Sequence, residues 1–168
     1  MKLAENKLVV VPGLGVGRVE ALQEMDVGSA TVRVFPVDMG EGGGVFYVPE
    51  DRVDSQGLRA PMDAKTAATI IDRIVAVEAP AKRSNWRQRQ KRYEEMIASN
   101  QPDELAALIG ELASVRRAKK KKKQVLSFVE RRLMERAKDL LFGELAAVTD
   151  HTRAFFERSM QGALAAAS

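Results

Sequence analysis

Short apolar runs alternate with glycine-rich turns over residues 7–60 of the chain. Glycine reaches the positive φ angles that tight turns need, and proline fixes φ, so both residues tend to end strands. Pro49 ends an apolar run in this way. The pattern predicts strands over residues 7–11, 18–25, 30–37 and 44–48, with residues 57–59 closing the set.

Asp63 marks the point at which the apolar period lengthens to about 3.6 residues, the period of a helix. We expect Asp63 to cap a helix that runs to about residue 77. Residues 80–83 contain a proline and interrupt the pattern. Ser84 or Asn85 is then placed to cap a second helix, which runs to about residue 98.

Start signals predict three more helices in the second half of the chain. Pro102 precedes two acidic residues, which is typical of a first helical turn. That helix is expected to end near residue 117. Ser127 and Glu130 have the spacing of a capping box, for a helix to about residue 148. Asp150 is expected to cap the last helix.

These patterns together predict an α+β fold. A small N-terminal β-barrel of the Tudor or SH3 kind would occupy residues 1–60. An all-α helical domain would occupy residues 61–168.

Charge divides the chain at nearly the same place. Residues 1–65 hold 7 basic and 10 acidic residues, a net charge of −3, and residues 66–168 hold 20 and 13, a net charge of +7. The excess of positive charge makes the helical half a candidate for binding an anionic partner.

The composition argues against several classes of function. The chain has no Cys, which excludes disulfides and thiolate metal sites, and its single histidine, His151, argues against a histidine metal site or a Ser-His triad. The glycines at 13–17 invite comparison with a dinucleotide-binding loop. However, Arg18 stands where the third glycine should be, so a plain turn is favoured. We expect no enzymatic activity, no cofactor and no metal.

A membrane role is not expected either. The chain has no apolar run of the roughly 18–20 residues that a membrane span needs. Its first residues lack the apolar stretch of a signal peptide. We expect a cytoplasmic protein that is monomeric.

One basic segment contains the only tryptophan of the chain. Residues 82–93 hold six basic residues and no acidic residue. On a helix, Trp86 would lie near basic side chains that contact phosphates, and its ring could be placed against bases. A core position for Trp86 with a merely solvated basic face is the alternative. The candidate DNA-binding residues here are Arg83, Asn85, Trp86, Arg87, Arg89, Lys91 and Arg92.

A second basic run holds seven basic residues in the eight positions 116–123. We expect it to lie between two helices, solvated and mobile because its like charges repel. It adds five candidate DNA-binding residues: Lys119, Lys120, Lys121, Lys122 and Lys123.

The β half offers a candidate protein-binding edge. A short strand that ends in proline is typical of a sheet edge, and such an edge can pair with a strand of a partner. The candidate contact residues are Val37, Tyr47, Val48 and Pro49.

An ordered set of motifs resembles the CarD/CdnL family of bacterial transcription factors. The set begins with the opening residues 9–19 and continues with the Val48-Pro49 pair before residues 57–59. It ends with Asn85-Trp86-x-x-Arg89 and the two stretches 126–130 and 137–146.

This resemblance implies a Tudor-like domain that docks on the β subunit of bacterial RNA polymerase. It also implies a helical domain that contacts promoter DNA near the upstream edge of the melted region, where the tryptophan acts as a wedge and stabilises the open complex. A nucleoid-associated location would follow. Tyr47 and Met25 depart from the family pattern, because some relatives have basic residues there that contact polymerase.

Two other functions remain open from the residues alone. One is a DNA- or RNA-binding module without polymerase contact. The other is a protein-interaction adaptor whose basic half is only solvated.

Overall fold

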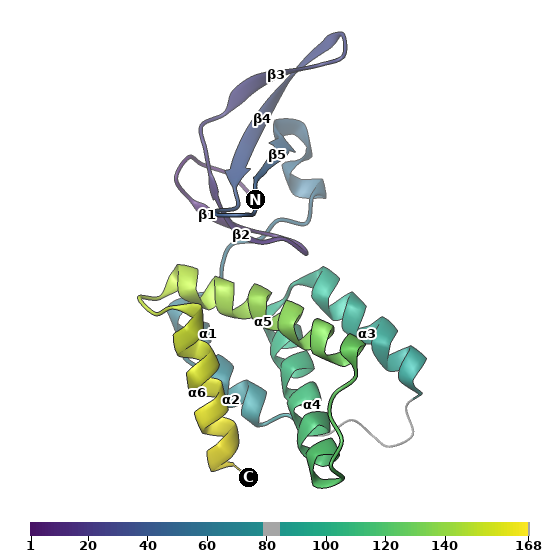
Figure 1. Cartoon of the computed structure of the whole chain (residues 1–168). Helices are drawn as coiled ribbons and strands as arrows, with labels where there is room; N and C mark the ends of the chain where they lie inside the picture. Colours follow the sequence, from purple (N-terminus) through teal and green to yellow (C-terminus); the bar gives the residue numbers. More distant parts are fainter. Residues whose placement is uncertain (79–84, 168) are drawn as a thin grey trace. The chain divides into compact units, whose positions relative to one another are not determined.

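The computed structural model describes residues 1–78 and 85–167, and it contains two compact units (Figure 1). The β unit comprises Met1–Pro61 and the helical unit Met62–Ser168. The expected α+β fold, with an N-terminal β domain and a C-terminal helical domain, is confirmed.

The β unit is an antiparallel sheet in which the long strand β4 is central. Strand β4 pairs with β2 and β3, and also with β5, while β1 pairs with β2. Arg59 closes the unit by a bridge to Val10, so the predicted closing segment does pair. The strands are β1 Leu8–Val11, β2 Gly15–Val19, β3 Gln23–Val27, β4 Ala30–Asp38 and β5 Val45–Pro49, and the 3-10 helix η1 Glu50–Ser55 follows them.

The prediction of one strand over residues 18–25 is wrong. Strand β2 ends at Val19, which pairs with Val37, and β3 begins at Gln23, which pairs with Val34. The chain advances four residues from Val19 to Gln23 while its partner strand advances three, from Val37 to Val34. The extra residue interrupts the ladder as a β-bulge does, and apolar alternation does not reveal it.

Valine side chains form the core of the β unit. Val9, Val11, Val19, Val37 and Val48 are buried together. The core requires close approach of β2 and β4, because a Cβ atom on Gly17 would lie 2.4 Å from Cγ1 of Val37. The plain turn predicted at the glycines of residues 13–17 holds for Gly13, whereas Gly15 and Gly17 belong to β2.

In its described residues, the helical unit packs six helices around one core, and Figure 1 shows how they are arranged. Helix α4 packs against α2, α3 and α5, and α6 packs against α2 and α5. The helices are α1 Ala64–Ala67, α2 Ile70–Val75, α3 Trp86–Ser99, α4 Pro102–Lys121, α5 Phe128–Val148 and α6 Arg153–Ala166.

Most of the predicted helix starts are confirmed. The side chain of Asp63 accepts a hydrogen bond from the Thr66 amide, and that of Asn85 accepts one from the Gln88 amide. Pro102 begins α4. Ser127 and its partner glutamate form the predicted capping box at the start of α5.

Three helix boundaries differ from the predictions. The first helix divides into α1 and α2 at Ala68 and Thr69, where the Thr69 hydroxyl donates to the Thr66 carbonyl and the backbone tightens. Helix α4 continues to Lys121, beyond the predicted end. Thr152, rather than Asp150, caps α6 through a hydrogen bond from the Phe155 amide.

Glycine at position 110 allows α2 to approach α4 closely. A Cβ atom there would lie 2.5 Å from Cβ of Val77 and 2.6 Å from the carbonyl oxygen of Ile74. Side chains on the same turns of α4, among them Leu108, Ile109 and Leu112, are buried in the core. The position of α2 therefore depends on the absence of a side chain at residue 110.

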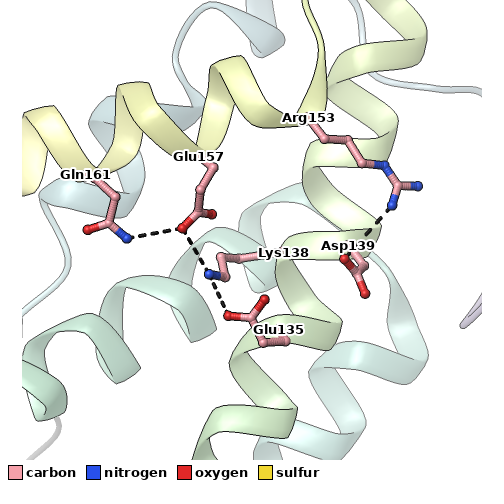
Figure 2. Close-up of polar contacts among 6 residues, drawn as sticks. All are labelled: Glu135, Lys138, Asp139, Arg153, Glu157 and Gln161. Carbon is pink, nitrogen blue, oxygen red and sulfur yellow. Dashed lines mark hydrogen bonds and ion pairs between the residues drawn. The ribbon is translucent and has the colours of Figure 1, made fainter.

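Two buried charges join α5 to its neighbours. Lys138 lies between Glu135, at 2.7 Å, and Glu157 of α6, at 3.1 Å (Figure 2). Glu144 accepts a hydrogen bond of 2.7 Å from the amide of Met62, at the start of the helical unit. Buried charges that lose their partners are costly, so these contacts favour one arrangement of the helices.

We predict that Gly110→Ala destabilises the helical unit by about 1–3 kcal/mol, because the new methyl group overlaps backbone of α2. The matched control is Gly162→Ala in α6, where a Cβ atom has no neighbour within 4 Å. Alanine is favoured over glycine in a helix, so the control is expected to stabilise by about 0.5–1 kcal/mol. Thermal unfolding followed by circular dichroism measures both. An equal effect of the two substitutions would contradict the close approach.

Candidate functional site

Trp86 is the first residue of α3 and is half-buried. Asn85 caps the helix through a 3.3 Å hydrogen bond from the Gln88 amide, which fixes the backbone on which the indole is carried. The indole packs against the core of the helical unit. The guanidinium of Arg89 lies 5.6 Å from the ring centroid, which suits a cation–π contact. Trp86 thus contacts the core and also keeps part of its surface accessible.

The basic residues of α3 fall into two groups. Arg87 and Lys91 are exposed, and neither side chain makes an ion pair or hydrogen bond within the described residues. Arg92, by contrast, forms two hydrogen bonds with the carboxylate of Glu111 on α4, at 3.0 and 2.6 Å. Arg87 and Lys91 are therefore available to phosphates, whereas Arg92 already holds a structural partner. Arg83, the other candidate of this segment, lies outside the described residues.

Tyr93 completes the contact between α3 and α4. Its side chain is fully buried, and its hydroxyl donates a 2.9 Å hydrogen bond to Glu111. Burial and the neighbouring carboxylate raise the pKa of Tyr93, so the phenol remains a donor. The hydrogen bonds to Glu111 also raise the pKa of Arg92. Glu111 therefore fixes α3, and with it Trp86, against α4.

The lysine run forms the last turn of α4 instead of a mobile connector. Lys119, Lys120 and Lys121 are helical, and positive charges are favourable at this end of the helix dipole. Lys123 has a φ of 58°, and its amide donates to the carbonyl of Lys120. The Gln124 amide donates to the Lys119 carbonyl, which completes a Schellman motif. The helix is therefore longer than predicted because the run has its own C-terminal cap.

Glu130 ties this end of α4 to the start of α5. Its carboxylate accepts hydrogen bonds from the Lys119 ammonium, at 2.8 Å, and from the Ser127 amide, at 2.7 Å. Burial by itself would raise the pKa of Glu130, but these hydrogen bonds outweigh it and lower the pKa. Lys119 is consequently engaged in the fold, whereas Lys120–Lys123 are exposed.

The candidate protein-binding residues of the β unit differ in their exposure. Val37 and Val48 are fully buried, and Val37 pairs through its backbone with Val19 and Phe46. These two residues support the sheet and present no side chain to a partner. Tyr47 is 45% exposed, and Pro49 is half-buried. The accessible part of the predicted contact surface is thus Tyr47 with Pro49.

Sequence reasoning missed three exposed apolar residues near the start of α5. Val125 is 80% exposed, Phe128 65% and Val129 37%. Arg132 lies over the Phe128 ring at 5.6 Å. A groove of about 760 Å³ runs beside Phe128, between α3 and α5. The exposure of Phe128 could have been predicted from the sequence. On the predicted helix, Phe128 falls on the same polar face as Arg131 and Arg132.

The described residues contain no group of three or more side chains suited to hold a metal ion. In the same part of the chain, no helix combines the length and the hydropathy needed to cross a bilayer.

Comparison with protein families gives a match in the second half of the chain. Residues 71–161, more than half of the chain, match the family described as CarD, C-terminal domain. The matched range contains α3, α4 and α5 with all the described basic residues considered above.

We predict that Glu130→Gln lowers the stability of the helical unit by about 1 kcal/mol at neutral pH, because the ion pair with Lys119 is lost. The folded pKa lies below that of the unfolded chain, about 4.3. The contribution is therefore present above that value and is lost as the pH falls through the folded pKa.

The difference in melting temperature between the original chain and Glu130→Gln should shrink as the pH falls below about 4. Glu95→Gln, at an exposed position on α3, is the control and should change little at any pH. A difference that stays constant with pH would contradict the assigned role of Glu130.

Proposed function

The chain belongs to the CarD family, and from this membership we propose a transcription regulator that docks on RNA polymerase and stabilises the promoter open complex. The family consists of transcription factors without enzymatic activity. In this proposal the β unit binds the β subunit of the polymerase. The helical unit contacts promoter DNA near the upstream edge of the melted region.

The proposed contact with promoter DNA rests on the arrangement of side chains on α3. A half-buried indole with an accessible portion is carried on the same helix as two exposed cations, Arg87 and Lys91, whose side chains have no partner among the described residues. Cations of this kind bind phosphates without reading sequence. An apolar ring inserted beside an unstacked base resists closure of the duplex, and we propose this role for Trp86.

The geometry of α3 supports such a wedge. An inserted side chain acts only if its helix resists displacement. The buried Tyr93 and the Arg92–Glu111 pair fix α3 against α4. We therefore propose that Arg92 serves DNA binding by positioning α3 instead of by contacting phosphate.

The polymerase part rests on the family resemblance and on the edge strand β5. This strand pairs with β4 alone among the described strands, so a further strand could pair with its outer edge. Tyr47 would contact the partner with an exposed aromatic ring. Docking would also raise the local concentration of the helical unit at the promoter, which makes a weak DNA contact effective.

We predict that Tyr47→Ala weakens binding to the polymerase β subunit about tenfold, because an exposed aromatic ring at an interface buries a large apolar area. The melting temperature should change little. Val27→Ala, at an exposed position at the end of β3, is the control. Pulldown and fluorescence anisotropy with the isolated β subunit measure the effect, and unchanged affinity would remove Tyr47 from the interface.

We predict that Trp86→Ala shortens the lifetime of the open complex about tenfold or more while polymerase binding is retained. The loss of packing by a half-buried indole should also lower stability by about 1–2 kcal/mol. The control is Met96→Ala, because Met96 is also half-buried, lies on α3 and packs against the same core. Open-complex decay after heparin challenge measures the lifetime.

The comparison of the two variants separates stability from function. Equal loss of stability with a shorter lifetime only for Trp86→Ala supports the wedge. A lifetime shortened equally by Met96→Ala would mean that the indole acts only through the fold, and the wedge would be rejected.

A further inference from the structure

A groove of about 520 Å³ lies between the last turn of α4 and the first turns of α5. Its volume is within the usual range of ligand-binding pockets. The residues that line it are Arg116, Lys120, Gln124, Val125, Leu126, Arg131, Met134 and Glu135.

The apolar part of the groove is held in a fixed conformation. Leu126 and Met134 are 5% and 2% exposed and pack into the core, while Val125 beside them is 80% exposed. The Schellman motif fixes the backbone before Val125, and the Ser127–Glu130 capping box fixes it afterwards. Because the backbone around Val125 is already ordered, a ligand that contacts this valine loses little binding free energy to the ordering of the protein. Val125 is therefore a good contact for another apolar side chain.

The polar part of the groove is positively charged. The side chains of Arg116, Lys120 and Arg131 make no ion pair or hydrogen bond within the described residues. The acidic member of the lining, Glu135, lies 2.7 Å from Lys138, which it shares with Glu157, so its charge is compensated in part. The groove thus offers three unpaired cations to a ligand, and Lys121 and its neighbours add to the field.

We propose that this groove binds an acidic peptide segment of a partner protein that carries a large apolar side chain. The apolar side chain would contact Val125, the exposed apolar residue of the lining. The carboxylates on either side of it would pair with the three cations. The Gln124 amide, which can both donate and accept, is placed to bond the peptide backbone.

The chemistry of the lining favours a peptide over a nucleic acid. Unpaired bases commonly bind protein surfaces by stacking on aromatic rings, and none of the described residues that line this groove is aromatic. Phosphates of a duplex would reach the cations but would gain nothing from an exposed valine. This inference does not depend on the proposed contact with promoter DNA, which involves α3.

The experiment uses the full chain and two fluorescein-labelled peptides of equal charge. One peptide alternates glutamate with leucine, and the other alternates glutamate with serine. Fluorescence polarisation at moderate salt should show tighter binding of the glutamate–leucine peptide. Val125→Ser should weaken that binding about tenfold, and Arg131→Gln about threefold.

Matched variants control for general effects. Val27→Ser removes a valine that is 56% exposed in the β unit, and Arg158→Gln removes an exposed arginine of α6. Neither should change peptide binding. A labelled DNA duplex is the other probe, and its binding should be unchanged by Val125→Ser.

Two results would overturn the proposal. Equal binding of the two peptides, or no effect of Val125→Ser, would mean that the surface attracts negative charge without a specific site. A loss of duplex binding in Val125→Ser as large as the loss of peptide binding would assign the groove to nucleic acid. Each outcome can be separated from failure of the open-complex role, because that role is tested at Trp86.

Discussion

The packing of α4 is the constraint on which the helical unit depends. One face of this helix is buried against α2, α3 and α5, and its glycine at 110 sets how closely α2 approaches. The same helix ends in the lysine run. The core therefore fixes the position of the most basic turn of the chain, and the charged end is part of the folded unit instead of an appended tail.

The basic residues of the helical unit have two distinct physical roles. Arg92, Lys119 and Lys138 have carboxylate partners, and they join α3 to α4, α4 to α5 and α5 to α6. Exposed residues such as Arg87 and Lys91 have no such partner among the described residues. Net charge alone overstates the surface available to an anion, because part of that charge stabilises the fold.

The sequence allowed most of the fold to be predicted, because caps are local. Asp63, Asn85 and Ser127 each bond an amide within the next turn, so residue type and spacing suffice to locate them. The bulge after Val19 and the burial of Val37 were not predictable in this way. Both depend on how β4 pairs with the neighbouring strands. The sequence of one strand does not indicate which residues of another strand it pairs with.

The candidate site shows the same limit. The pattern placed Trp86 on a basic helix but left open whether the ring is buried, and the structure shows that it is half-buried. The engagement of Arg92 with Glu111 joins residues on different helices, and no periodicity indicates it. The exposed Phe128 could have been found, because its position on the polar face of α5 follows from the helical period.

The left-handed conformation of Lys123 limits which substitutions can stabilise the basic C-terminal turn of α4 without loss of charge. A residue with a Cβ atom is destabilised in this conformation by roughly 1–2 kcal/mol, and glycine is the usual occupant at this position of a Schellman motif. The chain therefore carries a positive charge where a glycine would give a more stable turn. Charge and local stability are in conflict at this residue, so a thermostable variant obtained by placing glycine here would have a weaker electrostatic field.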